Sequence, residues 1–202
     1  MALSLLPTEL LISTANHLSS PQDLNCLAKT SRLLYQITNP ILYKNEIFHN
    51  KSSALLWAAE RGKLAPCSRL LSEGANPNIK DSHKRTPLSW AAGNGHADVV
   101  SILISTAQTD PNARDAYFQT PLFWAAGNGH TEIVKLLLTV PTVDPNQQTG
   151  IGDSALIYAV AGGHVDAVNV LLANEKVDPN VARDGGITAL AVAANHGRNG
   201  IM

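Results

Sequence analysis

The chain has 202 residues, of which 45% are hydrophobic and 15% are charged, and its formal net charge is −1. This composition excludes a largely disordered chain and suits one or two modest domains that bury a core. The balanced charge provides no basic patch for nucleic acid or an anionic membrane, so we expect neither as a partner.

Neither the N-terminus nor the cysteines indicate secretion. The first residues lack a basic segment, and Pro7 and Glu9 interrupt their apolar run, so the pattern is not that of a signal peptide. No apolar stretch reaches the length of a membrane span. Cys26 and Cys67 are far apart and neither has a metal-type spacing, which predicts no disulfide framework and no zinc site. We therefore expect a reducing compartment: the cytoplasm, the nucleus or both.

Residues 1–47 have no copy elsewhere in the chain and are predicted to form three short helices. The first begins at Pro7, because proline at the first helical position loses no backbone hydrogen bond. Ser20 and the acidic Asp23 mark the start of the second helix. The third covers about 31–38. Three helices of this size leave apolar surface that another protein or the following residues should cover.

The leucines and charged residues of this first unit follow a spacing that resembles the F-box, over residues 2–46. The matching residues are Leu6, Pro7, Glu9, Leu10, Leu11, Leu18, Asp23, Leu24, Leu27 and Arg32. The sequence departs from the pattern at Thr14, where Ile is usual, and at Ser31, where Cys is common. A hydroxyl at Thr14 is expected to weaken docking where that position is desolvated.

The F-box resemblance implies docking onto the small linker subunit of a cullin-RING ubiquitin ligase. The residues that it implies for this contact are Leu6, Pro7, Leu10, Leu11, Leu18, Leu24 and Leu27. The alternative is an N-terminal helical cap that only covers the first of the repeats described next.

From about residue 50 onward, one unit is repeated along the chain. Thr86, Thr120, Ser154 and Thr188 open similar segments at intervals of 34 residues, and Ser53 lies 33 residues before Thr86. A fixed period of this length indicates a stacked repeat array. A second marker keeps the same interval, in Asn76-Pro77-Asn78, Asp110-Pro111-Asn112, Asp144-Pro145-Asn146 and Asp178-Pro179-Asn180.

Each unit is predicted to contain two short helices and an extended turn. In the second unit, Thr86 serves as the N-cap and Pro87 as the first helical residue. Gly95 ends this helix. The second helix carries a wide apolar face of Val99, Val100, Ile102, Leu103 and Ile104. The turn follows at the Asp-Pro-Asn marker, where Pro fixes φ and Asp or Asn bonds its own backbone. A helix pair this short needs stacked neighbours to complete its core.

The segments TPLSWAAGNGHADVVSILI and TPLFWAAGNGHTEIVKLLL resemble the ankyrin repeat almost position by position. The resemblance covers residues 51–202, with units at about 51–83, 84–117, 118–151, 152–185 and a partial unit at 186–202. The usual His of the motif is replaced by Leu56, Ser89, Phe123, Ile157 or Ala191. A column of aromatic residues follows that position, and we expect it to pack in the core: Trp57, Trp90, Trp124 and Tyr158.

The two resemblances together imply an all-α protein, an F-box-like helical unit followed by an ankyrin solenoid of helix-turn-helix repeats with hairpin loops. An ankyrin array binds proteins without chemistry of its own. Its variable positions lie on the concave face, the surface formed by the hairpin tips and the first helix of each repeat. The contacts that this implies are Ser82, His83, Arg85, Asn94, Ala116, Tyr117, Gln119, Asn128, Ile151 and Asp153.

Tyr117 and Phe118 are the strongest individual candidates, because exposed aromatic side chains often anchor interfaces. The alternative for both is packing between adjacent hairpins, which weighs more for Phe118 than for Tyr117. The array stops at Met202 before the second helix of its fifth unit. We expect a truncated array, a fragment of a longer one or an edge that a partner completes.

Two patterns suggest chemistry, and we favour a structural interpretation of both. Gly152-Asp153-Ser154 resembles the start of one lipase and esterase motif, but Ser154 shares the N-cap register of Thr86. His96, His130 and His164 also recur every 34 residues, which places them on successive layers about 10 Å apart. That spacing is too wide for one metal ion. We expect no enzyme activity, no metal and no cofactor.

The two resemblances therefore imply an adaptor, which we expect to be monomeric. Its F-box-like unit would bind the ligase linker subunit, and its ankyrin repeats would recruit an unidentified protein substrate for ubiquitination. The first alternative is an ankyrin scaffold whose degenerate F-box serves only as a cap. An enzyme is the third hypothesis and depends on Gly152-Asp153-Ser154 alone.

Overall fold

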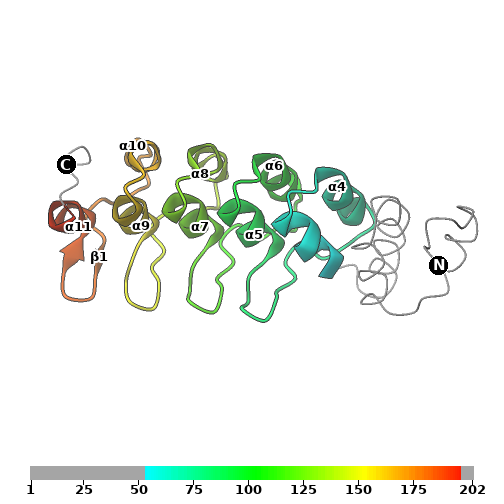
Figure 1. The fold of residues 1–202 in the computed structure, drawn as a ribbon, viewed down its shortest axis with the longest axis horizontal. Helices are drawn as coiled ribbons and strands as arrows, with labels where there is room; N and C mark the ends of the chain where they lie inside the picture. The colour runs from blue at the N-terminus through cyan, green and yellow to red at the C-terminus, as the bar shows by residue number, and fades with distance from the viewer. Residues whose placement is uncertain (1–52, 197–202) are drawn as a thin grey trace, which may run out of the picture. The chain divides into compact units, whose positions relative to one another are not determined.

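The computed structural model describes residues 53–196, and those from 55 onward belong to one compact unit (Figure 1). The F-box-like helices predicted for 1–47 and their contact residues lie outside the described part of the chain. Within 53–196 the fold is helical apart from two strands of two residues each, in agreement with the predicted all-α class. Residues 53–60 are helical and begin the array.

The described helices form two layers that follow the repeat order (Figure 1). The first helix of each repeat lies in the inner layer, which contains α5 (Pro87–Gly93), α7 (Pro121–Gly127), α9 (Ala155–Gly162) and α11 (Ala189–Asn195). The second helix lies in the outer layer, which contains α4 (Leu64–Ser72), α6 (Ala97–Ser105), α8 (Thr131–Leu138) and α10 (Val165–Leu172). Neighbouring inner helices pack against one another, and α5, α7 and α9 also pack against the outer helices of their own repeats, α6, α8 and α10.

The repeated Thr or Ser begins each inner helix, as predicted. The Thr86 Oγ1 accepts a hydrogen bond from the Ser89 amide at 3.2 Å, and Pro87 occupies the first helical position. The same cap recurs at Thr120, Ser154 and Thr188. The hydroxyl satisfies an amide that has no partner within the helix, so this register is fixed by local chemistry.

The core lies between the two layers and has a small-residue side and a large-residue side. Ala91 and Ala92 are fully buried on α5, which allows neighbouring inner helices to approach closely. On α6 the side chains of Val99, Val100 and Leu103 are buried. The predicted apolar face of this helix was too wide, because Ile102 and Ile104 are only half-buried.

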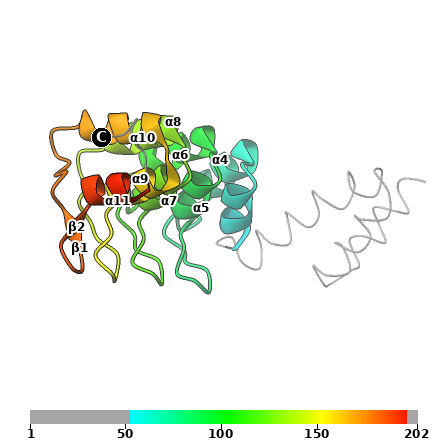
Figure 2. The same cartoon turned by 60° about the vertical axis from the view of Figure 1, so that its left-hand side comes forward.

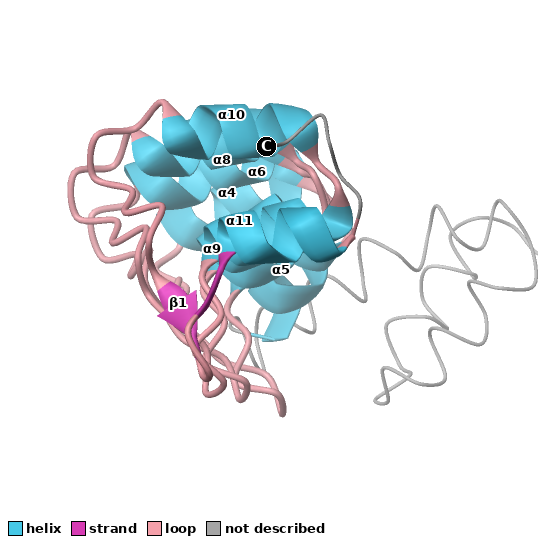
Figure 3. Ribbon diagram, turned by 90° about the vertical axis from the view of Figure 1, so that its left-hand side faces the viewer, coloured by secondary structure: helices cyan, strands magenta, loops and turns pink. Residues whose placement is uncertain are grey.

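Hairpin loops connect the repeats and project away from the helices (Figures 2 and 3). The last of them contains β1 (Ala182–Arg183) and β2 (Ile187–Thr188), which pair antiparallel with Ala182 opposite Thr188. Near the first three tips one residue adopts a left-handed backbone, at Lys84, Phe118 and Gly152, and in the last hairpin both Gly185 and Gly186 do so. A bulky residue such as Phe118 at φ 63° is uncommon and indicates a tightly held turn.

The Asp-Pro-Asn markers link consecutive repeats on the outer side. Asp110 Oδ1 accepts from the Asn112 amide at 2.9 Å and closes its own turn, as predicted. The Asn112 side chain then donates to the Thr142 carbonyl at 2.7 Å and accepts from the Asp144 amide at 3.0 Å. The same bridge connects the other markers, so the marker also ties each repeat to the next.

The repeated histidines also join adjacent repeats, and the structural interpretation is confirmed. His130 Nε2 lies 3.0 Å from the carbonyl oxygen of Gly93 in the preceding repeat. His96 and His164 make the equivalent contacts. Each ring lies over a glycine with positive φ: a Cβ on Gly129, for example, would be 2.5 Å from Nδ1 of His164. Glycine is therefore required twice here, for the backbone conformation and for the space.

Candidate partner-binding surface

Three large apolar side chains are exposed on two consecutive hairpins of the concave face. Tyr117 is 60% exposed, Phe118 51% and Ile151 58%. The Phe118 ring also approaches the next hairpin, since a Cβ on Gly150 would lie 3.5 Å from its Cδ2. One side of the Phe118 ring therefore packs against the next hairpin while the rest is open to solvent. Tyr117 is more exposed than Phe118. We refer to Tyr117, Phe118 and Ile151 as the tip cluster.

A buried aspartate holds the hairpin that carries Tyr117. Asp115 Oδ1 accepts hydrogen bonds from the Tyr117 and Gln119 amides at 2.8 and 2.9 Å. Its Oδ2 accepts from the indole Nε1 of Trp124 at 3.1 Å, which ties the loop to α7. Asp81 makes the same three contacts one repeat earlier. These bonds fix the tip before any partner arrives.

The column of aromatic residues lies at the surface of the concave face and not in the core. Trp57 is 39% exposed, and Trp90, Trp124 and Tyr158 are half-buried. The prediction of core packing was wrong because it ignored the polar atom of each ring. An indole N–H needs a hydrogen-bond acceptor, and the hairpin aspartates provide one at the edge of the helix layer.

Arg85 lies between two of these rings. Its guanidinium carbon is 4.8 Å from the Trp90 ring centroid and 4.2 Å from that of Trp124 in the next repeat. The Arg85 Nε is 3.9 Å from Oδ2 of Asp115 and is buried without a hydrogen bond. A planar cation can stack on aromatic faces. Arg85 therefore links its own repeat to the next one through its contact with the Trp124 ring and its charge attraction to Asp115.

Asp153 and Arg183 form an ion pair in the corresponding place at the last hairpins, with the charges exchanged. Their Nη1 to Oδ1 distance is 3.7 Å, beyond hydrogen-bonding range, and Oδ1 of Asp153 has no hydrogen-bond partner. The Asp153 side chain is only 7% exposed. Burial raises the pKa of this carboxyl, and the charge of Arg183 partly opposes the shift.

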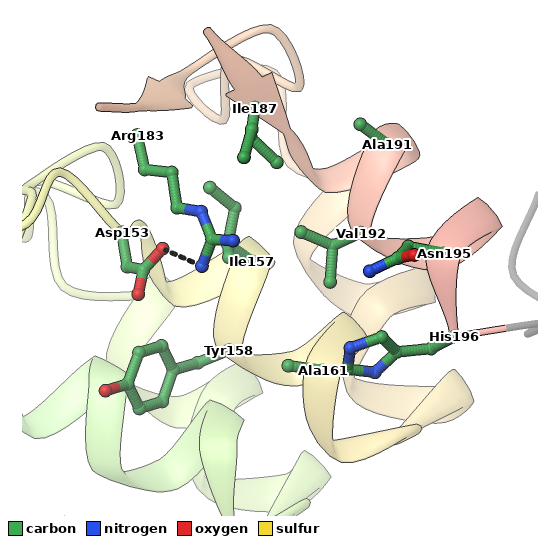
Figure 4. Close-up of a pocket in the computed structure, with 10 residues that line it drawn as sticks. All are labelled: Asp153, Ile157, Tyr158, Ala161, Arg183, Ile187, Ala191, Val192, Asn195 and His196. Carbon is green, nitrogen blue, oxygen red and sulfur yellow. Dashed lines mark ion pairs between the residues drawn. The ribbon is translucent and has the colours of Figure 1, made fainter. Parts of the chain in front are cut away.

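A pocket of about 320 Å³ lies beside this pair, between α9 and α11 (Figure 4). Ile157 and Val192 face each other across it, Arg183 lies at its hairpin end and His196 at the opposite end. Its size is within the range of about 300–1,000 Å³ that is typical of ligand sites.

The structure separates the ten predicted contact residues into three groups. Those exposed on the hairpins are Ser82, His83, Ala116, Tyr117 and Ile151. Those whose side chains are engaged within the array on the hairpin side are Arg85, Gln119 and Asp153.

The third group lies at the other end of the inner helices. The Asn94 side chain donates to the Glu60 carbonyl at 3.0 Å, and Asn128 donates to that of Gly93 at 2.7 Å. Sequence reasoning missed the exposed Trp57 and the pocket residues Arg183 and Val192. The signal for Val192 was present, because it interrupts the aromatic column.

Ser154 caps α9, in agreement with the register that it shares with Thr86. Its Oγ accepts from the Ile157 amide at 3.3 Å, and the residue is 3% exposed. Among residues 53–196 no cluster of three or more His, Cys, Asp or Glu side chains could hold a metal ion. The helices described in that range include none that is both long and apolar enough to cross a membrane.

The two-layer stack, the capped inner helices and the hairpins define an ankyrin-repeat solenoid. A family model of ankyrin repeats in three copies matches residues 24–115, 55–149 and 122–202, so the chain belongs to this family. The matching model describes a repeat family and not a family of enzymes. Its repeats indicate protein–protein interaction. No F-box family is detected in the chain.

Several curated proteins are similar to parts of this chain. Ankyrin repeat domain-containing protein 49 of Bos taurus is 48% identical over 65 residues, 32% of this chain and 27% of that protein. Its Homo sapiens counterpart is 43% identical over 65 residues, again 27% of its length. A putative E3 ubiquitin-protein ligase, XBAT31 of Arabidopsis thaliana, is 38% identical over 80 residues, 39% of this chain and 17% of that protein. The chain therefore spans about a quarter or less of these relatives.

Proposed function

We propose that this protein is a substrate-recruiting adaptor of a cullin-RING ubiquitin ligase. In this proposal, residues 2–46 dock on the linker subunit and the concave face holds a protein substrate. The tip cluster carries the second half of the proposal, since it exposes three large apolar side chains on an array of a protein-binding family. Such an adaptor would act in the cytoplasm, the nucleus or both.

The geometry of the tip cluster is suited to binding with little loss of entropy. Tyr117 is held by the Asp115 carboxylate through its own amide, and Phe118 rests against Gly150 of the next hairpin. Side chains that are ordered before binding lose less conformational entropy in the complex. Tyrosine in particular offers a large apolar surface with a polar end, which is common in binding hot spots.

Two observations support the ligase half of the proposal. The spacing of Leu6, Pro7, Leu10 and Leu11 follows the F-box pattern. XBAT31, which is similar over 80 residues, carries the name of a putative E3 ubiquitin-protein ligase. A linker docked near the N-terminus and a substrate held by the repeats would turn binding into proximity for ubiquitin transfer.

One observation favours a second candidate, an ankyrin scaffold without ligase docking. The family match begins at residue 24, inside the stretch that resembles an F-box. In that case the residues from 24 onward would serve as a degenerate repeat that covers the first helix pair. Thr14, in place of the usual Ile, fits this candidate as well.

A binding titration decides between the two candidates. Purified linker subunit is titrated into the full chain and into a Leu10→Asp, Leu11→Asp double variant, with circular dichroism to show that both are folded. Saturable binding that is lost in the double variant is the expected result. No binding by the folded wild-type chain would eliminate the adaptor and leave the scaffold.

The substrate surface is tested separately by quantitative co-purification from cells. The wild-type chain is compared with a tip variant that carries both Tyr117→Ala and Ile151→Ala. The control is Leu64→Ala, which removes an apolar side chain that is 40% exposed on the outer layer. We expect a set of proteins to be retained by the control and reduced at least about tenfold by the tip variant. Equal recovery by all three chains would contradict a role for the tip cluster.

A further inference from the structure

Two consecutive hairpins of the array each contact the aromatic ring of the repeat that follows. The contact comes from the position four residues after the aspartate that holds each hairpin: Arg85 follows Asp81, and Gln119 follows Asp115. Arg85 lies over the Trp124 ring at 4.2 Å, and Gln119 Nε2 donates to the Tyr158 hydroxyl oxygen at 3.1 Å. A polar hairpin side chain and an aromatic ring one repeat later therefore form a recurring pair.

The next pair in this series is incomplete. Asp153 is the hairpin residue, and the position of the ring is occupied by Val192, 34 residues after Tyr158. In the preceding repeats each ring rests on the inner helix before it: a Cβ on Gly127 would be 3.1 Å from Cδ1 of Tyr158, and Phe123 contacts the same ring at 4.7 Å. The residues in register with Gly127 and Phe123 are Ala161 and Ile157.

Those same residues line the pocket between α9 and α11. Ile157, Ala161 and Val192 form its apolar wall, and Asp153 and Arg183 lie at its hairpin end (Figure 4). The pocket is thus the space that an aromatic ring fills in the earlier repeats and that the short side chain of Val192 leaves open. Its polar end contains a carboxylate that is 7% exposed and whose Oδ1 has no hydrogen bond.

We propose that this pocket binds a tyrosine or tryptophan side chain of a protein partner. The ring would lie against Ile157 and Ala161, where the array's own rings lie in the preceding repeats. Its O–H or N–H would donate to the carboxylate of Asp153, which occupies the register position from which Gln119 contacts the Tyr158 hydroxyl. This inference rests on the proposed protein-binding function and adds a specific anchor to it.

The chemistry of the pocket distinguishes this occupant from others. A phenylalanine would fill the apolar space but leave the buried carboxylate oxygen unsatisfied, which is unfavourable. A lysine or arginine would bring its charge next to Arg183, which already lies 3.7 Å from the carboxylate. An aromatic ring instead offers Arg183 a face on which to stack, as Arg85 does on Trp124.

The first test uses small probes, so it does not depend on knowing the partner. N-acetyl-tyrosinamide and N-acetyl-phenylalaninamide are titrated into the full chain, and methyl NMR signals of Ile157, Ile187 and Val192 are followed. We expect saturable shifts at these methyls with millimolar affinity, and about tenfold tighter binding of the tyrosine probe. Asp153→Ala should make the two affinities equal.

The second test fills the pocket from within the chain. Val192→Tyr should raise the melting temperature by about 2–4 °C relative to Val192→Phe. It should also abolish the probe shifts, and Asp153→Ala should remove the difference between the two variants. Because no partner is involved, failure here leaves the tip cluster and its separate co-purification test unaffected.

Three results would overturn the pocket proposal. They are equal binding of the two probes by the wild-type chain, absence of shifts at the pocket methyls, and a Val192→Tyr variant that is no more stable than Val192→Phe. Any one of them would show that Asp153 does not serve as an acceptor for an aromatic donor.

Discussion

The guanidinium of Arg85 and the indole of Trp124 stack at 4.2 Å although they belong to consecutive repeats. The same cation also lies over the Trp90 ring, 4.8 Å from its centroid. Three side chains from two repeats therefore act as one unit on the concave face. Because the contact crosses a repeat boundary, it contributes to the coupling between neighbours, on which the stability of a solenoid depends.

Replacing Arg85 should weaken this coupling more than a surface substitution does. We expect Arg85→Ala to lower the free energy of unfolding by about 1–3 kcal/mol, and Arg85→Lys by about 1 kcal/mol because an ammonium cannot stack on both rings. Urea unfolding followed by circular dichroism measures both. Arg114→Ala is the control, since Arg114 is exposed and makes one side-chain hydrogen bond, to Gln147. Equal losses for Arg85→Ala and Arg114→Ala would contradict a coupling role for the contacts of Arg85 with Trp90 and Trp124.

The glycines beneath the histidine rings give a second prediction with an internal control. Gly129 has φ 73°, and an added Cβ would lie 2.5 Å from Nδ1 of His164, whereas Gly74 has φ 83° and nothing within 4 Å of an added Cβ. Gly74→Ala should cost about 1 kcal/mol for backbone strain alone. Gly129→Ala should cost about 1–3 kcal/mol more, because the ring must move and its bond to Gly127 is disturbed.

The His164→Ala background separates the two causes. In that background the excess cost of Gly129→Ala over Gly74→Ala should disappear, as measured by urea unfolding. An excess that persists without the His164 ring would show that the backbone, and not the ring, limits this position.

Local chemistry made much of the fold predictable from the sequence. A Thr followed by Pro predicts a capped helix because both residues act within one turn, and Thr86-Pro87 and Thr120-Pro121 do so in the structure. The structural interpretation of His130 was correct because a 34-residue interval places the repeated histidines on separate layers, where each joins two repeats. The overall stack follows from the period itself.

The concave face was less predictable because its contacts join residues from different repeats. The sequence shows Trp90 as one of a column of large rings, which suggests a core, yet its indole N–H is held at the surface by Asp81. Asn94, a predicted contact residue, is exposed, and its side chain also donates to the Glu60 carbonyl of the preceding repeat, a bond that the sequence does not reveal. The link between Asp153 and the Val192 position emerges only when the hairpin of one repeat is seen above the helix of the next.

The reactivity of Cys67 provides a third prediction. Its side chain is fully buried on α4, and burial raises the pKa of its thiol to about 12. The thiolate is the reactive form, so the native protein should resist alkylation at mildly alkaline pH. In a Cys26→Ser variant, the rate with iodoacetamide should be on the order of a thousandfold lower in native buffer than in guanidinium chloride. Similar rates in the two conditions would mean that α4 opens readily.

The buried carboxyl of Asp153 gives a fourth prediction, in which stability depends on pH. Its pKa is raised above the ordinary value of 3.8, so over the interval between the unfolded and folded pKa values the folded chain holds more protons than the unfolded chain. The contribution of this group to the free energy of unfolding therefore decreases as pH rises through that interval. Asp153→Asn cannot titrate and is free of this decrease.

The stability of Asp153→Asn relative to wild type should accordingly be greater at about pH 7 than at about pH 4, as measured by urea unfolding at each pH. Arg183→Gln provides the second arm, because Arg183 lowers the pKa of Asp153 and its removal should raise that pKa further. The contribution of Asp153 in this background is obtained by comparing Arg183→Gln with the Asp153→Asn, Arg183→Gln double variant. The dependence of that contribution to the free energy of unfolding on pH should then be steeper. A difference between Asp153→Asn and wild type that is constant with pH would show that ionised Asp153 is as well solvated in the folded protein as in the unfolded chain.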